Sequence, residues 1–66
     1  MTINVNHESK TVATTSSLDQ LLEHLKISKQ GIAVAINNQI ISKNNWKQTH
    51  LSENDNVTII QATQGG

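Results

Sequence analysis

The segment at residues 17–26, SLDQLLEHLK, constrains the fold of this chain more than any other part of the sequence. Leu18, Leu21, Leu22 and Leu25 recur at the spacing i, i+3, i+4 and i+7, which aligns them along one side of an α-helix. A chain of 66 residues has room for a single thin core. We therefore expect one domain, in which this leucine stripe packs against the rest of the chain.

Both ends of this helix carry sequence signals. Ser17, followed three residues later by Gln20, fits a capping box, and Asp19 places a carboxylate in the first turn, where it suits the helix dipole. We expect the helix to end near Ile27 or Ser28. The helix side chains that we expect to face water are Asp19, Glu23 and Lys26.

The residues before the helix alternate as in a β-strand. Over residues 1–6, Ile3 and Val5 share one face while polar side chains take the other, which indicates a half-buried strand. Residues 6–8 have turn chemistry, and residues 10–13 can return as a second, weaker strand. The sequence therefore predicts an N-terminal hairpin.

The residues after the helix predict a second strand pair. Gly31 lies where the chain must turn back, and the segment at 31–37, GIAVAIN, is apolar on both faces. Such a strand is expected inside a sheet with a helix against one side, so we place it centrally. Asn37 and Asn38 can adopt positive φ in a tight turn, after which residues 39–42 form a short strand.

The last third of the chain contains one long connection and one strand. Residues 43–52 read as irregular, with Trp46 and Leu51 as apolar anchors that fold the connection onto the domain. A turn at 53–56 leads into a final alternating strand at 57–62. The expected fold is α+β, with one helix on one face of a mixed four- to five-stranded sheet.

Composition excludes several classes of function. Arginine is absent and five lysines balance five acidic residues, so no basic run exists to bind nucleic acid or an anionic membrane. No cysteine is present, so any sulfur chemistry must use a partner's thiol. The opening MTINVNHESK lacks the apolar core of a signal peptide, and no apolar stretch approaches the roughly 20 residues that span a bilayer. We expect a soluble, cytoplasmic protein.

We find no sequence pattern for catalysis or metal binding. His7, His24 and His50 are widely separated, without an HExxH motif or a cysteine, so we expect surface histidines and no metal site. No GxSxG elbow surrounds a serine, and neither GxGxxG nor GxxxxGK[ST] occurs. No catalytic residue is predicted within the domain.

The final segment, QATQGG, carries two of the chain's three glycines, Gly65 and Gly66. A diglycine cannot strengthen a strand, but without Cβ atoms it can pass along a narrow channel and deliver a carboxylate to another protein's active site. We predict a domain at 1–62 and a flexible tail at 63–66, which reaches about 13 Å when extended.

An ordered set of motifs carries a family resemblance. The motifs are INVN, SLDQLLEHL, VAINNQIISKNNW with its tryptophan, LSENDNVTII and the terminal GG. With them the chain resembles the sulfur carriers of the ubiquitin-like β-grasp superfamily, most closely the small carriers of bacterial thiazole (thiamine) biosynthesis. Two departures stand out: Ser42 and Lys43 replace the common Pro-Arg, and Asn54 and Asp55 replace the common Gly-Asp.

The resemblance implies a carrier or co-substrate rather than an enzyme. An E1-like adenylyltransferase would use Mg-ATP to adenylate the Gly66 carboxylate, and a cysteine desulfurase or persulfide system would convert it to a thiocarboxylate. A thiazole synthase would receive the sulfur, and Gly65 would give the tail access to these enzymes. No permanently bound cofactor is implied.

Three alternatives stay open at this point. A carrier for molybdopterin synthesis would use the same terminal chemistry. A ubiquitin-like modifier would join Gly66 to lysines of target proteins, and a purely structural binding module would not need its last two residues.

We also predict a partner-docking face beside the tail. If Val57 and Ile59 point toward the helix, Ile60 and Ala62 project from the other face of the sheet. The predicted docking residues are Ile60, Ala62, Thr63 and Gln64. The competing interpretation of Ile60 is an ordinary exposed apolar residue.

Overall fold

A computed structural model describes residues 1–61 and confirms the α+β fold. The elements are β1 (Thr2–Val5), β2 (Glu8–Thr11), α1 (Leu18–His24), β3 (Ile32–Ile36), β4 (Gln39–Ile41), the 3₁₀ helix η1 (Lys43–Asn45) and β5 (Asn56–Gln61). The predicted tail at 63–66 and its boundary with the domain at residue 62 lie outside the described residues.

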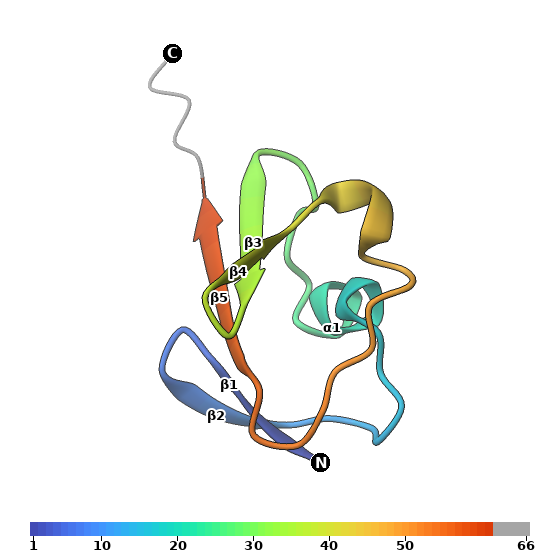
Figure 1. Ribbon diagram of the computed structural model, residues 1–66, viewed down its shortest axis with the longest axis vertical. Helices are drawn as coiled ribbons and strands as arrows, with labels where there is room; N and C mark the ends of the chain where they lie inside the picture. Colours follow the sequence, from blue (N-terminus) through green and yellow to red (C-terminus); the bar gives the residue numbers. More distant parts are fainter. Residues whose placement is uncertain (62–66) are drawn as a thin grey trace.

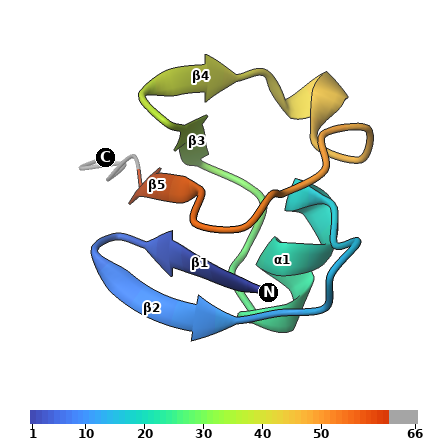
Figure 2. The ribbon, with the colours of Figure 1, turned by 60° about the horizontal axis from the view of Figure 1, so that its bottom comes forward.

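The five strands form one mixed sheet in the order β2-β1-β5-β3-β4. β1 and β5 run parallel, and the other neighbouring pairs are antiparallel (Figures 1 and 2). The central strand is therefore β5, and the prediction that residues 31–37 are central was wrong. Apolar residues on both faces indicate only that a strand lies inside the sheet, between two other strands. β3 does lie inside the sheet, but one position away from its centre.

Two-residue turns close both hairpins. Asn6 and His7 have φ values of 51° and 71°, and Asn37 and Asn38 repeat the same pair of values. Positive φ at both central residues is typical of a type I′ turn, whose twist matches that of the flanking strands. The first turn places Val5 opposite Glu8, so β2 begins two residues before the predicted start at residue 10.

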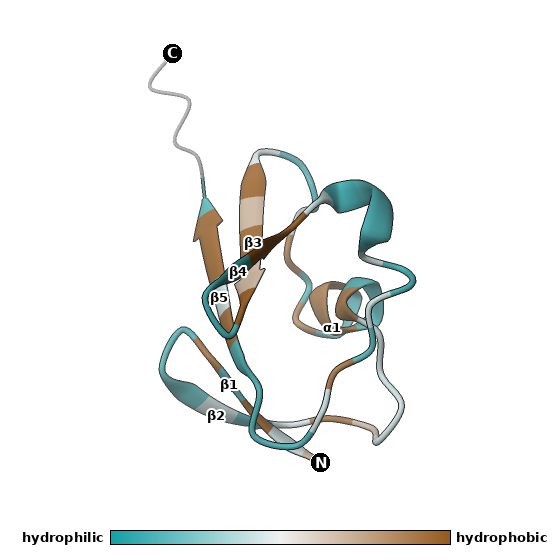
Figure 3. Ribbon diagram, in the orientation of Figure 1, coloured by the Kyte–Doolittle hydropathy of each residue, from teal (hydrophilic) through white to brown (hydrophobic). Residues whose placement is uncertain are grey.

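One helix covers one face of the sheet, with α1 and the strands enclosing the core (Figure 2). Much of β3, β4 and β5 is hydrophobic in Figure 3, whereas η1 is hydrophilic. Of the leucine stripe, Leu18, Leu21 and Leu22 are fully buried and Leu25 is partly buried. The buried core consists of Ile3, Val5, Leu18, Leu21, Leu22, Val34, Trp46, Leu51, Val57 and Ile59.

The start of α1 is capped as the sequence predicts. The backbone N–H of Gln20 donates to Ser17 Oγ at 3.2 Å, and the Ser17 N–H donates to Gln20 Oε1 at 3.0 Å. The 43–52 connection satisfies another first-turn donor, since Leu18 N–H donates to the Thr49 carbonyl at 2.8 Å. The connection therefore stabilises the N-terminal end of α1.

Asp19 does not face water as predicted. Its side chain is largely buried, and the residue as a whole is 9% exposed. The 43–52 connection lies against this residue, whose N–H donates to the Trp46 carbonyl at 3.2 Å. Its carboxylate is paired with Lys29 Nζ at 2.9 Å. Glu23 and Lys26 are exposed as predicted.

α1 ends at His24, before the predicted end near Ile27. Lys26 has a φ of 59°, and its N–H donates to the Glu23 carbonyl at 3.1 Å. The N–H of Ile27 donates to the Leu22 carbonyl at 3.0 Å, which completes a Schellman motif. A lysine holds the left-handed position where glycine is usual, so the sequence carried no stop signal there.

Candidate functional site

The face of the sheet opposite α1 presents an apolar surface. The antiparallel register pairs Ala33 with Ile60 and Ala35 with both Thr58 and Ile40. Paired residues of neighbouring antiparallel strands project from the same side of a sheet, so these five residues share one surface. We call them the open face.

Two of the open-face residues are unusual in their exposure. Ile40 is 66% exposed and Ile60 is 54% exposed, and within residues 1–61 they are the exposed large hydrophobics. The structure places Ile60 on the face that the sequence predicted. Ile40 was missed, although a two-residue turn at 37–38 already implied that it lies across from Ala35. The predicted docking residues Ala62, Thr63 and Gln64 lie outside the described residues.

The open face continues across β1 and β2 as an uncharged polar surface. The register places Asn4 opposite Ser9 and Asn56, and Thr2 opposite Thr11, on the same side as Thr58 and Ile60. No strand residue on this side, as far as Gln61, carries a charge. A partner that docks here therefore meets apolar and neutral polar groups.

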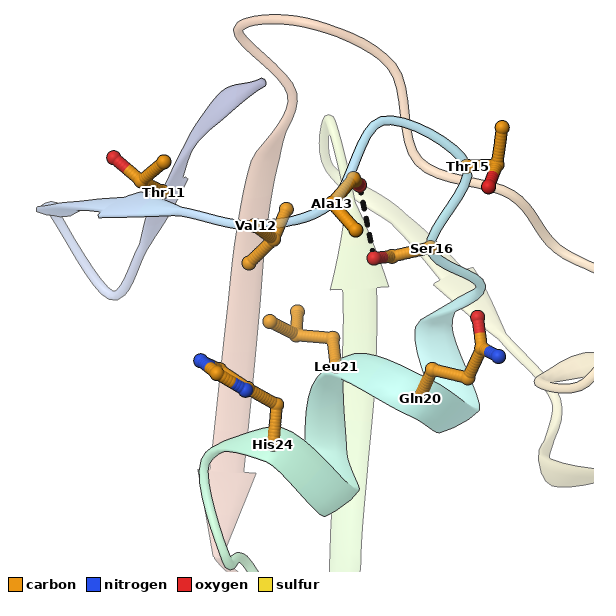
Figure 4. Close-up of a pocket in the computed structure, with 8 residues that line it drawn as sticks. All are labelled: Thr11, Val12, Ala13, Thr15, Ser16, Gln20, Leu21 and His24. Carbon is orange, nitrogen blue, oxygen red and sulfur yellow. Dashed lines mark hydrogen bonds between the residues drawn. The ribbon is translucent and has the colours of Figure 1, made fainter.

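A hollow between α1 and the chain that leads into it has no catalytic pair (Figure 4). The Ser16 hydroxyl donates to the Ala13 carbonyl at 2.9 Å. His24 lies beyond Leu21 in this view and does not face the hydroxyl. The remaining lining side chains are those of Thr11, Val12, Thr15 and Gln20.

A second hollow lies beside Trp46 and is lined by Asp19 and Lys29, which form an ion pair. Lys29 Nζ contacts Glu23 Oε2 at 2.7 Å and Asp19 Oδ1 at 2.9 Å. The hydrogen bonds to Glu23 and Asp19 raise the pKa of Lys29 above its ordinary value of 10.5. Two carboxylates thus hold this amine, which identifies a structural ion-pair cluster rather than a free base.

The histidines lie where the sequence predicted. His7, His24 and His50 are all exposed. In the part of the chain that the structure describes, no group of three or more His, Cys, Asp or Glu residues could hold a metal ion. None of the helices over residues 1–61 is long and apolar enough to cross a bilayer. The predicted working residues, Gly65 and Gly66, lie outside the described residues.

Fold and site together define a class of protein. One helix across a five-stranded mixed sheet with parallel central strands is the ubiquitin-like β-grasp fold, and here it displays a neutral, partly apolar face. The chain belongs to the ThiS family, whose model matches residues 3–66.

Relatives with known names or structures match the chain over its full length. The Sulfur carrier protein ThiS of Escherichia coli (strain K12) is 32% identical over 66 residues, covering all of both chains. The crystal structure of the thiamine biosynthesis protein ThiS from Geobacter metallireducens has a TM-score of 0.87 at 25% identity and full coverage of both chains. A solution structure of a thiamine biosynthesis protein from the same organism has a TM-score of 0.81 at 25% identity, covering all of this chain and 88% of that one.

Proposed function

We propose that this protein is a sulfur carrier of thiamine biosynthesis and that the Gly66 carboxylate carries the sulfur. The observation that supports this most is the ThiS family match, which runs from residue 3 to Gly66 and so includes the diglycine. The full-length similarity to a relative named as a sulfur carrier supports the same function.

The chemistry begins with activation of the carboxylate. A carboxylate is a poor acyl donor, because its charge is delocalised and its oxygen is a bad leaving group. An E1-like adenylyltransferase uses Mg-ATP to form the Gly66 acyl-adenylate and releases pyrophosphate. ATP and its metal ion belong to this partner enzyme and not to the carrier.

Sulfur then replaces AMP on the same carbon. A persulfide supplied by a cysteine desulfurase system attacks the acyl-adenylate and AMP leaves, which gives an acyl disulfide. A second thiol attacks the partner's sulfur of that bond, forms a disulfide with it and releases a thiocarboxylate on Gly66. The chain has no cysteine, so each thiol in these steps comes from a partner. A thiazole synthase uses the thiocarboxylate sulfur to build the thiazole ring.

This chain contributes a docking surface and a slim reactive end. Ile40 and Ile60 give the open face exposed apolar area for contact with the adenylyltransferase and the synthase. Gly65 lacks a Cβ atom and allows the chain to enter a narrow channel. The role of this protein is to present the Gly66 carboxylate, and the enzymes that bind it supply the catalysis.

Genetic complementation tests the pathway. The gene is expressed in a thiazole-requiring strain that lacks its own carrier, together with the adenylating enzyme and synthase from the same genome as this chain. The expected result is growth without added thiazole, and loss of that growth when Gly66 is deleted. Restored molybdopterin synthesis in a second strain that lacks its molybdopterin carrier, without growth of the thiazole-requiring strain, would assign the carrier to the competing pathway. Conjugates on target lysines would identify a modifier instead.

A further inference from the structure

The side chain of Asn6 occupies the place of a missing strand residue beside β5. β1 pairs with β5 only as far as Val5 opposite Val57, and the backbone N–H of Asn6 then donates to the Val57 carbonyl at 2.9 Å. At Asn6 the backbone turns away into the type I′ turn. The next β5 residue that faces β1 is Ile59, and the Asn6 side chain meets it instead of the backbone.

The amide of Asn6 pairs with Ile59 as a peptide group would. Asn6 Oδ1 accepts from the Ile59 N–H at 2.8 Å, and Asn6 Nδ2 donates to the Ile59 carbonyl at 3.2 Å. Both hydrogen bonds are partly buried. The side chain thus extends the parallel ladder by one step, and we call this pair of hydrogen bonds the Asn6 clamp.

The Asn6 clamp lies close to the C-terminal end of β5. Ile59 precedes Gln61, the last residue of β5, by two positions. On its other edge, β5 is held by β3 as far as Gln61 opposite Ile32. Among the described residues, the Asn6 clamp is the last hydrogen-bonded contact that holds β5 from the β1 side.

We propose that Asn6 is a positioning residue that fixes the end of β5 at Gln61, and through it the presentation of Gly66 to the adenylating enzyme. The second part of this inference rests on the proposed function. A shift of Gln61 moves the point from which the chain continues toward Gly66, and a displacement of about 1 Å at a reacting group can lower a rate severalfold or more.

Asn37 provides a matched control. It occupies the same turn position as Asn6, with the same φ of 51°. Its Oδ1 accepts from the Asn56 N–H at 3.0 Å, and its Nδ2 donates to Asp55 Oδ1 at 3.1 Å. Asn37 therefore holds the start of β5, at the opposite end of the strand from Gln61.

Substitution by glycine tests the role of the side-chain amide separately from that of the turn conformation at both sites. Glycine adopts positive φ without strain, so Asn6→Gly and Asn37→Gly both keep their turns and lose only the side-chain hydrogen bonds. Asn6→Asp keeps the acceptor for Ile59 N–H but turns a carboxylate oxygen toward the Ile59 carbonyl, so we expect this repulsion to disturb the end of β5 at least as much as Asn6→Gly does.

The first measurement is NMR of the isolated protein and needs no partner. In Asn6→Gly we expect amide exchange of Ile59 to accelerate about fivefold or more, and the order parameter of Gln61 to fall. In Asn37→Gly we expect faster exchange at Asn56 and an unchanged Gln61. An unchanged Gln61 in Asn6→Gly would overturn the inference.

The second measurement is steady-state adenylation with an E1-like enzyme and Mg-ATP, at a temperature where circular dichroism shows all variants folded. Asn6→Gly is expected to lower kcat about threefold or more with KM within about twofold, because the open face is intact. Asn37→Gly is expected to match wild type. An equal loss in both variants, or a wild-type kcat in Asn6→Gly, contradicts the positioning role.

The two measurements separate this inference from the proposed function. If wild type itself acquires no AMP, the proposed function fails and the positioning role in adenylation fails with it. The NMR result for Gln61 then decides alone whether Asn6 fixes the end of β5.

Discussion

The indole N–H of Trp46 donates to the carbonyl of Ile41 at 3.0 Å, which ties the 43–52 connection to the end of β4. The carbonyl of Trp46 accepts from the N–H of Asp19 at 3.2 Å, so the same residue also contacts the start of α1. Trp46 is 3% exposed and is the only aromatic residue of the chain. It joins the edge of the sheet, the connection and the helix into one core.

Removal of this side chain should destabilise the whole domain. Trp46→Ala is expected to lower the free energy of unfolding by about 3 kcal/mol, because a large buried side chain is lost and a cavity remains. Urea denaturation followed by circular dichroism measures the change. Trp46→Phe keeps most of the apolar volume but loses the hydrogen bond to Ile41, and should cost less. Equal stability of wild type and Trp46→Ala would contradict the anchoring role.

The Lys29 ion pairs predict a pH dependence at the alkaline end. Glu23 and Asp19 raise the pKa of Lys29 above 10.5, so the folded state holds this proton more tightly than the unfolded chain. The stabilisation is therefore fully present below pH 10.5 and is lost as the pH rises through the folded-state pKa. Wild type should melt at a higher temperature than Lys29→Met near neutral pH, and the difference should shrink at alkaline pH.

Lys47→Met is the control for this measurement, since Lys47 is exposed and forms no ion pair with residues 1–61. Its difference in melting temperature from wild type should stay small throughout. A Lys29→Met difference that grows with pH would contradict the assignment.

The open face should be needed for docking and not for folding. Ile40→Glu and Ile60→Glu place a charge on exposed positions, so the free energy of unfolding should change by less than about 1 kcal/mol. The KM for the adenylating enzyme should rise about tenfold, because a charge would have to be desolvated in an apolar contact. Ser9→Glu, on the polar half of the same side, is the matched control. An unchanged KM in both isoleucine variants would contradict the docking role and would indicate that Ile60 is an ordinary exposed apolar residue.

Local sequence patterns predicted the elements that depend on neighbouring residues. The leucine stripe, the Ser17 capping box and the Asn37 turn are all in place, because each depends on residues within one turn or one hairpin. The buried positions of Trp46 and Leu51 also followed, since few other apolar residues were available to anchor that connection.

Local sequence patterns could not predict the features that depend on contacts between distant residues. Asp19 lies against a connection that begins 24 positions later at Lys43, and no spacing rule reports that contact. The end of α1 rests on a lysine in the left-handed region, where the sequence offered no glycine. The Asn6 clamp reaches a residue 53 positions away, so the short segment around Asn6 indicated only a turn. The predicted roles of Gly65 and Gly66 remain predictions.

Intact-mass analysis tests the central claim most directly. The protein is incubated with an E1-like adenylating enzyme, Mg-ATP, a cysteine desulfurase with its substrate cysteine, and a thiol reductant, beside a variant that lacks Gly66. Wild type is expected to gain first the mass of an adenylyl group and then, after AMP leaves, the mass difference of one sulfur for one oxygen, located at Gly66 by fragmentation, while the variant gains neither. A folded wild type that acquires neither AMP nor sulfur would contradict the sulfur-carrier function.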